Sequence, residues 1–512
     1  MNFYFLLPEA AAFGVLVVST LTVIARSEAT KQSQGWLRPF GARNDGGGFL
    51  LTLSFAGIFL VLISLLPLAG KEEAAFGGMF ILDPLAAFFK AFFTLVLAVV
   101  ICMSSEFFPP PHPPLSPQGG EGKGEGEFLL ILWTSLLGLF FLVSANDFLL
   151  LFISLEIFTL SLYILAAYLK HSLVSIEAGL KYLILGSLAS AFLIYGISLL
   201  YVAAGSTGLP DIREAFRREP HNRLILLGML FIISGLGFKV ASVPFQLWVP
   251  DVYEGAPTPV VAYLSVASKG AGFALLLRLL FTVFIPFDSG RVLLFSGLAA
   301  MTLVYGNLGA LVQTNIKRLF GYSSIGHAGY LLIGIAAGKE AGTSAVIYYL
   351  MAYAVSNLAA FLVITVVSRG GVSPPDAGRG DRAPASDRID ACRGLAKRSP
   401  FLAGTFFVAL LSLAGVPPLA GFFGKFLILL AAVRSNLEWI ALLGALAVAV
   451  SLFYYLTLVR VMYFEEPNDA SPLALSPFVK FILILLVLSI FALGLWQAPF
   501  FAFSLSAARS LF

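Results

Sequence analysis

Cysteine is scarce in this sequence. Only Cys102 and Cys392 occur among 512 residues, and they lie far apart. A cysteine-ligated iron–sulfur cluster takes about four thiolates, so the chain cannot hold one by itself. Two distant cysteines also do not make a disulfide framework. No GxGxxG motif follows a predicted strand, which argues against a nicotinamide site. We therefore expect no cofactor and no metal in this chain.

Charged residues are also few. They make up 12% of the chain, against 59% hydrophobic residues, and the mean hydropathy is +0.92. A soluble domain carries roughly a quarter charged residues, so the composition indicates a polytopic protein of the lipid bilayer. The net charge of +4 is small and scattered. Nothing in it points to nucleic acid as a partner.

Long apolar runs are what the sequence has in abundance. A helix needs about 20 apolar residues to cross the hydrocarbon. The first run lacks a basic leader and a clear cleavage site, so we interpret it as a retained span. The fold class predicted is an all-α polytopic membrane protein with about 14 transmembrane helices. The runs are 5–25, 49–69, 79–103, 128–145, 148–169, 178–203, 223–248, 258–285, 291–314, 322–337, 343–368, 400–432, 437–463 and 475–497.

Three polar segments interrupt this pattern, at 26–48, 109–127 and 369–399. Their Gly, Pro and charge content cannot bury enough apolar surface to fold, so we expect extramembrane loops without an assigned function. The predicted divisions are three N-terminal spans, a loop insert, a first repeat, a second repeat and a C-terminal span. Their residues are 1–103 (with insert 26–48), 104–127, 128–285, 291–463 (with insert 369–399) and 475–512.

The basic residues of the loops predict the orientation. Loops after odd-numbered spans carry about twice as many Lys and Arg residues as loops after even-numbered spans. By the positive-inside rule, the odd loops are cytoplasmic and both termini lie outside.

Several ionisable residues fall inside the predicted spans. Each central charge costs roughly 2.5–3.5 kcal/mol to insert, so these side chains must face the bundle interior, pair, or line water. Only one acidic residue is assigned to the depth of a span, so lysines are in excess. A lysine, unlike an arginine, can give up its proton when buried. The residues are Lys90, Glu156, Lys181, Lys239, Lys269, His327 and Lys425.

Lysines without deep acidic partners are the pattern expected of proton handling. The alternative is snorkelling of long side chains to the interface. It stays open chiefly for Lys90 and Lys181, which lie nearer span ends. For Lys181 a local i,i+4 pair with Glu177 is a further possibility.

Prolines are expected to interrupt two of the lysine-bearing spans. Pro244 removes a backbone hydrogen bond five residues after Lys239, so the seventh span should break there. In the twelfth span, LSLAGVPPLAGFFGKF, Pro417 and Pro418 precede Lys425 by about two turns. The freed carbonyls need water or side chains. Interrupted helices at corresponding places predict two inverted five-helix repeats, spans 4–8 and 9–13.

Four stretches carry a resemblance to a known family. PFQLWVPDVYEGAPTPVVAYLSVASK, IEAGLKYLILGSLASAFLIYGISLLY, NIKRLFGYSSIGHAGYLL and LSLAGVPPLAGFFGKF resemble the subunit N family of bacterial proton-pumping NADH–quinone oxidoreductase, complex I, whose members are antiporter-like membrane subunits. The PDVYEGAPTP loop distinguishes this family from its paralogues. The likeness runs from about Phe80 to the C-terminus, two inserts aside.

The resemblance implies a role for each matching residue. Glu156 matches the glutamate that modulates a partner lysine, and Lys239 the proton acceptor on the input side. Lys269 matches the central lysine, and Lys425 the lysine leading to the exit side. At lower priority, Lys181 matches a lysine of less settled role, and His327 a candidate relay.

One position departs from the family. Gln246 stands in PFQLW where the family often has His. A glutamine amide does not titrate, so it can order water but cannot pass a proton in that way.

The resemblance also implies a setting. The chain would be a subunit of a translocase in the bacterial inner membrane, beside other membrane-arm subunits, with FMN and iron–sulfur clusters in partner subunits. Alternatives are a Mrp-type cation/proton antiporter, a membrane hydrogenase subunit, or a non-pumping scaffold with inert buried charges.

Overall fold

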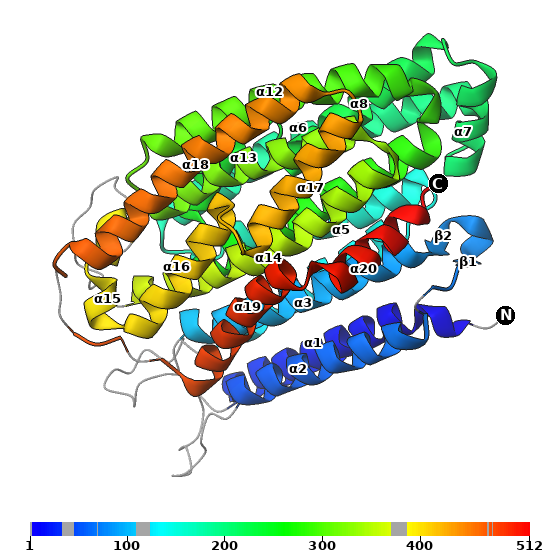
Figure 1. Cartoon of the computed structure of the whole chain (residues 1–512). Coiled ribbons are helices and arrows are strands. Elements are labelled where there is room, and N and C mark those ends of the chain that lie inside the picture. Colours follow the sequence, from blue (N-terminus) through cyan, green and yellow to red (C-terminus); the bar gives the residue numbers. More distant parts are fainter. Residues whose placement is uncertain are drawn as a thin grey trace.

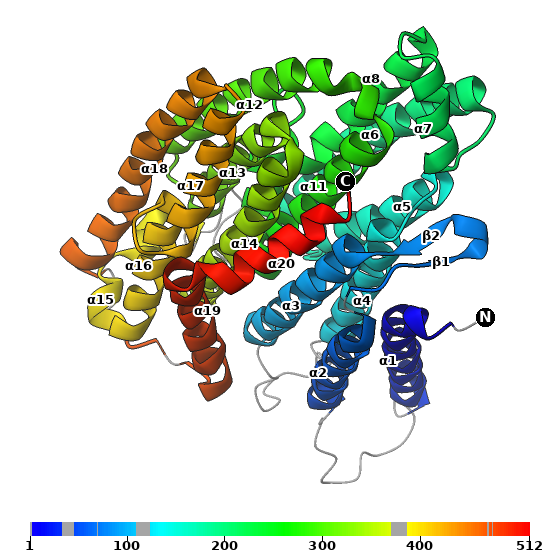
Figure 2. The same cartoon turned by 45° about the vertical axis from the view of Figure 1, so that its right-hand side comes forward.

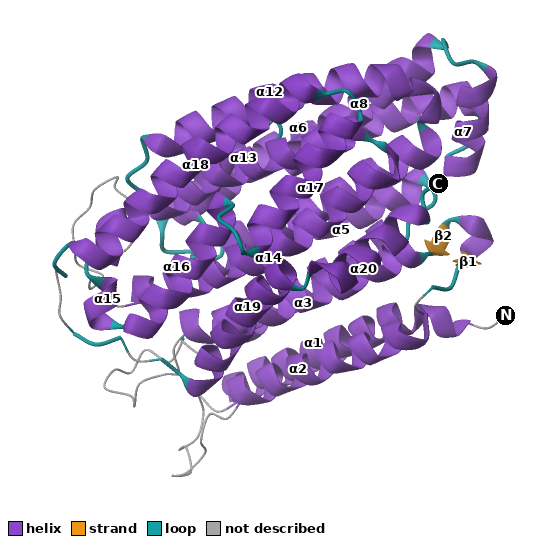
Figure 3. Cartoon of the chain, in the orientation of Figure 1, coloured by secondary structure: helices purple, strands orange, loops and turns teal. Residues whose placement is uncertain are grey.

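In its described part, the computed structural model is a bundle of helices with one short strand pair (Figures 1 and 3). It describes residues 3–32, 46–68, 70–108, 123–369, 387–467, 471–473 and 475–512. Within these residues, 13 helices are long and apolar enough to cross a membrane. Lipid offers no hydrogen-bonding partners to the backbone, so these long apolar sequences satisfy their own N–H and C=O groups by forming helices.

Thirteen long helices or continuous helical runs make up most of the described chain. They are α1 (Leu7–Gln32), α2 (Gly46–Leu65), α3 (Pro84–Phe107), α4 (Lys123–Val143), α5 (Phe148–Ala166), α6 (Leu173–Ala204), α8 (Arg223–Val240), α10 (Thr258–Tyr263) continuing through the π-helical η4 (Leu264–Ser268) into α11 (Lys269–Arg278) and the π-helical η5 (Leu279–Val283), α12 (Asp288–Leu311), α13 (Ile316–Ala337), α14 (Lys339–Arg369), α18 (Glu438–Phe464) and α19 (Pro477–Leu495).

Shorter elements complete the chain. They are η1 (Phe3–Leu6), η2 (Leu66–Leu68), β1 (Glu73–Ala75), η3 (Phe76–Gly78), β2 (Phe80–Leu82), α7 (Leu209–Arg218), α9 (Trp248–Gly255), η6 (Ile285–Phe287), η8 (Ile389–Cys392), α15 (Leu395–Arg398), α16 (Pro400–Ala414), α17 (Ala420–Arg434) and α20 (Gln497–Arg509). The strands pair antiparallel, with Ala74 opposite Ile81. Sequence reading did not anticipate this hairpin, α7 or α20.

The count of spans agrees with the prediction. The predicted twelfth span, 400–432, is the pair α16 and α17, each of 15 residues and too short to be counted with the 13 long helices. Taken together, the pair supplies the fourteenth crossing. With an even number of crossings, both ends of the chain lie at the same end of the bundle (Figure 1).

The chain leaves helical geometry near both predicted breaks. α8 ends at Val240, and α9 begins at Trp248. α16 ends at Ala414, and α17 begins at Ala420. Each first segment ends on a left-handed residue, Ala241 (φ 62°) or Gly415 (φ 91°). In both cases the amide after that residue bonds back five residues, which closes a Schellman motif. The grouping of these interruptions into two inverted repeats stays a prediction.

The most buried spans form the centre of the bundle. All of the apolar window in Thr258–Val283, 94% of that in Ile316–Ala337 and 89% of that in Lys339–Ser368 is buried. The α1–α2 hairpin is peripheral, with 28% and 33%. Figure 2 shows it on the opposite side of the molecule from α12 and α18.

The polar inserts are shorter than predicted where the structure describes them. α1 continues to Gln32, α2 begins at Gly46 and α4 at Lys123, each inside a predicted loop. Residues 387–399 are packed rather than loop-like, because Cys392 and Leu395 are buried and Asp387 forms a buried ion pair with Lys317 at 2.7 Å. The remainder of the three inserts lies outside the described residues.

Candidate functional site

Lys239 lies in the last turn of α8 and is 3% exposed. Its Nζ donates to Thr159 Oγ1 of α5 at 2.6 Å. Aromatic faces enclose the ammonium, with Nζ 5.7 Å from the Phe238 ring centroid and 6.0 Å from that of Tyr163. The charge is thus held inside the protein by one hydroxyl and two π faces, the arrangement expected of a cation removed from water.

Glu156 lies on α5, one turn from Thr159, so both side chains share a face of that helix. The Glu156 carboxylate is half-buried and accepts a hydrogen bond from Ser190 Oγ of α6 at 2.6 Å. It makes no ion pair with Lys239 in the described part of the chain. The structure therefore brings the two predicted partners into neighbouring positions, with Thr159 as the group that touches the lysine.

Lys269 begins α11 directly after the π-helical segment η4, and it is 2% exposed. Its Nζ donates to the carbonyl of Ser324 on α13. The preceding residue, Ser268, donates to the Lys239 carbonyl at 3.4 Å. A β-carbon on Gly272 would lie 3.5 Å from Lys239 Cβ, so α11 packs directly on the end of α8. The two lysines thus belong to one packed unit.

Lys425 lies in the second turn of α17 and is 3% exposed. Its Nζ donates to the carbonyls of Leu413 and Ala414, at 2.8 and 3.0 Å. These are the last carbonyls of α16, where the helix dipole favours a cation by about 0.3–1 kcal/mol. The freed carbonyls of the second break are thereby satisfied by the lysine itself.

His327 of α13 lies within a cluster of hydroxyls. Its Nδ1 is 2.5 Å from Tyr349 Oη, and its Nε2 is 3.2 Å from Tyr455 Oη. Tyr455 in turn meets Ser323 Oγ. Both ring nitrogens of His327 therefore have hydroxyl partners, which can act as donors or acceptors as the tautomer changes. Sequence reading named His327 but not its two tyrosines, which sit on α14 and α18.

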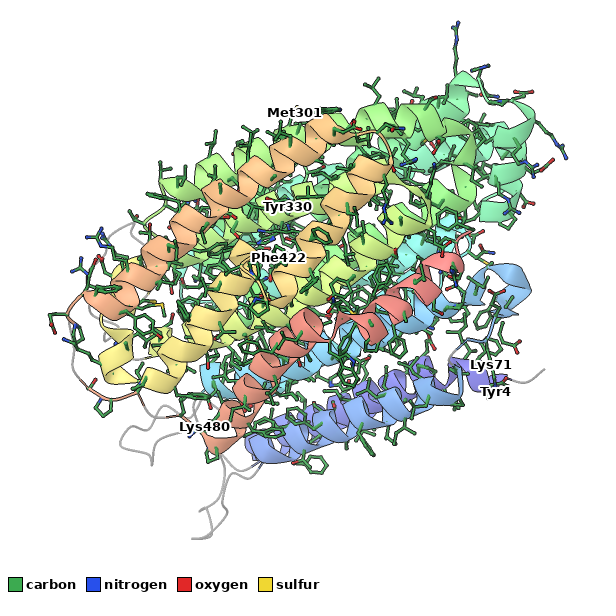
Figure 4. The ribbon with its side chains drawn as sticks, viewed as in Figure 1. Tyr4, Lys71, Met301, Tyr330, Phe422 and Lys480 are labelled. Carbon is green, nitrogen blue, oxygen red and sulfur yellow. The ribbon has the colours of Figure 1, made fainter. Side chains whose placement is uncertain are left out.

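An aromatic ring separates this cluster from Lys425. Lys425 Nζ is 4.9 Å from the ring centroid of Tyr330. The Tyr330 hydroxyl donates to the Gly444 carbonyl at 2.9 Å. Figure 4 shows Tyr330 among the helices of the bundle, whereas Met301 points away at its outer edge. The ring contributes a π face to the cation, and the tyrosine proton is engaged elsewhere.

Lys181 lies apart from the other lysines, in an ion-pair cluster near the start of α6. It pairs with Glu177 at 2.8 Å, as the i,i+4 alternative predicted, and with Asp251 of α9 at 2.8 Å. Arg318 of α13 joins Asp251 at 2.6 Å and Glu254 at 2.9 Å. Partial burial of Asp251 works against its charge, but the hydrogen bonds from Lys181 and Arg318 outweigh it and hold the pKa of Asp251 below its usual range. The cluster ties α6, α9 and α13 together.

Lys90 has a partner that sequence reading missed. Its side chain is fully buried, and Nζ lies 2.5 Å from Glu9 Oε1 on α1. Glu156 is therefore not the only acid within a span, and the snorkelling alternative is wrong for Lys90. The signal was available, since Glu9 falls within the first apolar run. A second missed pair, Asp83–Arg278 at 2.8 Å, is also buried.

Gln246 lies in the interruption between α8 and α9 and is 4% exposed. Its amide side chain cannot titrate. Among the described residues, no group of three or more His, Cys, Asp and Glu side chains could hold a metal ion.

Comparison with known proteins decides the family. A family described as "NADH:quinone oxidoreductase/Mrp antiporter, TM" matches residues 145–451. "NADH-quinone oxidoreductase subunit N" of Moorella thermoacetica is 38% identical over 455 residues, covering 87% of this chain and 91% of that protein. The chain belongs to the subunit N family of NADH-quinone oxidoreductases.

Solved structures agree with this family membership. A chain of respiratory complex I from Thermus thermophilus, solved with bound aureothin, is 32% identical with a TM-score of 0.76, covering 97% of this chain and 98% of that chain. A chain of the Mrp complex from Dietzia sp. has a TM-score of 0.83 at 19% identity, covering 100% of this chain and 98% of that one. The latter likeness shows the fold that the subunit N family shares with Mrp subunits.

Proposed function

We propose that this chain, a membrane-arm subunit of proton-translocating NADH-quinone oxidoreductase, moves protons through Glu156, Lys239, Lys269 and Lys425. One observation carries the proposal. The three lysines are 2–3% exposed, and in the described residues their ammonium groups bind hydroxyl or carbonyl oxygens rather than carboxylates. A lysine held by neutral oxygens keeps a weaker hold on its proton than one in an ion pair.

Membership of the subunit N family supports the wider setting. Electron transfer from NADH to quinone would take place in partner subunits, which would hold the FMN and the iron–sulfur clusters. This chain would receive conformational and electrostatic change along the membrane arm, beside paralogous antiporter-like subunits and small membrane subunits. We place it in the bacterial inner membrane with both termini outside, as the distribution of basic loop residues indicates.

The proposed order of proton transfer follows the packing. Lys239 accepts the proton first. Glu156 lies on the same face of α5 as Thr159, which binds the Lys239 ammonium, so the charge of Glu156 affects how readily Lys239 takes up the proton. The proton passes to Lys269 across the contact between α8 and α11, and His327 with its tyrosines carries it toward Lys425. Lys181 sits in the ion-pair cluster, so its role is to hold α6 to α9 rather than to pass protons.

The test compares substitutions within the assembled complex. Lys239→Ala is expected to cut proton pumping at least about tenfold per complex, because the first acceptor is lost. Pumping is followed by dye quenching in proteoliposomes driven by NADH, with assembly checked on native gels. The matched control is Lys480→Ala, an exposed lysine of α19 at the lower edge of the bundle (Figure 4). A fully assembled Lys239→Ala complex that pumps like the control would leave only a scaffold role.

A further inference from the structure

At the end of α8 the carbonyls of Gly237 and Phe238 accept backbone N–H groups of the closing turn, from Ser242 at 3.0 Å and from Ala241 at 3.2 Å. Side chains add further donors to the carbonyls of this last turn. Trp248 Nε1 donates to the Phe238 carbonyl at 2.9 Å. Ser268 Oγ donates to the Lys239 carbonyl at 3.4 Å, and Ser242 Oγ to the Gly237 carbonyl at 3.3 Å. The best of these bonds comes from Trp248, the first residue of α9, so it joins the segment after the interruption to the segment before it.

The indole ring is fixed as well as the N–H. Trp248 is 2% exposed and stacks on Tyr182 of α6, with ring centroids 4.7 Å apart at 23°. The Phe238 ring lies 5.3 Å from it. Aromatic pairs at these separations contribute about 0.5–1.5 kcal/mol each beyond their buried area. The Tyr182 and Phe238 rings are also 6.0 Å apart, so the three rings pack as one cluster that holds Trp248 while its N–H reaches the helix end.

The backbone conformation at the end of α8 is costly and requires contacts that stabilise it. Ala241 takes a left-handed conformation (φ 62°), which costs a non-glycine residue roughly 1–2 kcal/mol. Two residues, Lys239 and Val240, lie between Phe238 and Ala241. A shift of this turn would therefore move Lys239 relative to Thr159 on α5. Their hydrogen bond is short, at 2.6 Å, so even a small shift would lengthen or break it.

We propose that Trp248 is a positioning residue for Lys239, acting through its indole N–H on the Phe238 carbonyl. The tryptophan itself passes no proton. It holds the last turn of α8 so that the Lys239 ammonium meets Thr159 and faces the Ser268–Lys269 segment. This inference rests on the proposed function, in which Lys239 is the first proton acceptor.

The primary variant is Trp248→Phe, which keeps an aromatic ring for stacking and removes the N–H donor. Loss of one such hydrogen bond is expected to lower the pumping rate of the complex about three- to tenfold. The matched control is Trp133→Phe: Trp133 is equally buried and donates to Ser54 Oγ at 3.2 Å, on the α2–α4 contact away from the lysines. Control complexes should pump at the wild-type rate. Trp248→His restores a ring N–H and should recover part of the loss.

A coupling experiment separates positioning from general stability. Thr159→Val removes the oxygen that Lys239 meets. If Trp248 acts by presenting Lys239 to that oxygen, Trp248→Phe should cost much less in the Thr159→Val background than alone. Equal losses in the two backgrounds would overturn the proposal. So would wild-type pumping by an assembled Trp248→Phe complex.

Two further outcomes are decisive. If Trp248→Phe fails to assemble while Trp133→Phe assembles, Trp248 is required for folding and the positioning role is refuted. Lys239→Ala is measured in the same series. If that variant pumps normally, the proposed function fails; if it does not pump but Trp248→Phe does, only the inference about Trp248 fails.

Discussion

The buried pair between Glu9 and Lys90 allows a quantitative test of how the α1–α2 hairpin is attached. Both groups are nearly inaccessible, at 4% and 0% exposure, and lie 2.5 Å apart. Removing one member of such a pair leaves an uncompensated buried charge and costs about 3–5 kcal/mol, whereas removing both is often close to neutral. Glu9→Gln and Lys90→Met alone should therefore be far more disruptive than the two together.

The hairpin offers a direct readout of this energy. Because α1 and α2 are peripheral, with 28% and 33% of their apolar windows buried, we expect them to open locally before the rest of the bundle. A loss of about 3–5 kcal/mol corresponds to roughly 10²–10⁴-fold faster amide hydrogen exchange in these helices. Mass spectrometry of the purified complex measures this exchange, and the double variant should return to within about tenfold of wild type.

The control and the refuting results are also set by the structure. Lys71 is exposed and reaches the Tyr4 hydroxyl at 3.1 Å near the same hairpin. Lys71→Met should leave exchange unchanged, because a surface contact of this kind is worth little. Single variants with wild-type exchange would show that the pair does not fasten α1. A double variant as labile as the singles would show that packing lost at these positions, rather than charge, is responsible.

Three other predictions follow from the site. Lys425→Met should abolish most pumping and leave two α16 carbonyls without a donor, whereas Lys480→Met should do neither; NADH-driven dye quenching distinguishes them. Gly421→Ala should prevent assembly, as seen on native gels, because its β-carbon would lie 1.8 Å from the Ser412 carbonyl oxygen. The pKa of Asp251 is lowered, so the stabilisation from its charge is fully present above the ordinary aspartate pKa and disappears as the pH falls through the lowered pKa. Asp251→Asn should therefore lower the thermal inactivation temperature of the complex at pH 7. At a pH below the lowered pKa, the variant and the wild type should inactivate at the same temperature.

Sequence reading predicted the crossings well because hydropathy and helix length are local properties. The chain leaves helical geometry near Pro244 and Pro417, as expected because proline acts on its own turn; that these places are the broken helices of two repeats stays a prediction. It could not give Thr159 as the partner of Lys239, because that contact joins helices 80 positions apart in sequence. The tyrosines around His327 were missed for the same reason. Glu9 was different: it was visible in an apolar run, and only its partner required the structure.

The contact of Lys425 with Leu413 and Ala414 has a mechanical consequence. The ammonium belongs to α17, while the oxygens that stabilise it belong to the other side of the interruption. Rotation or sliding of α16 against α17 would move both carbonyl oxygens away from the ammonium group together. Protonation of Lys425 and the relative position of α16 and α17 are therefore coupled. Loss of the proton would weaken the bonds that join the two helices, and a shift of the helices would remove the oxygens that stabilise the protonated lysine.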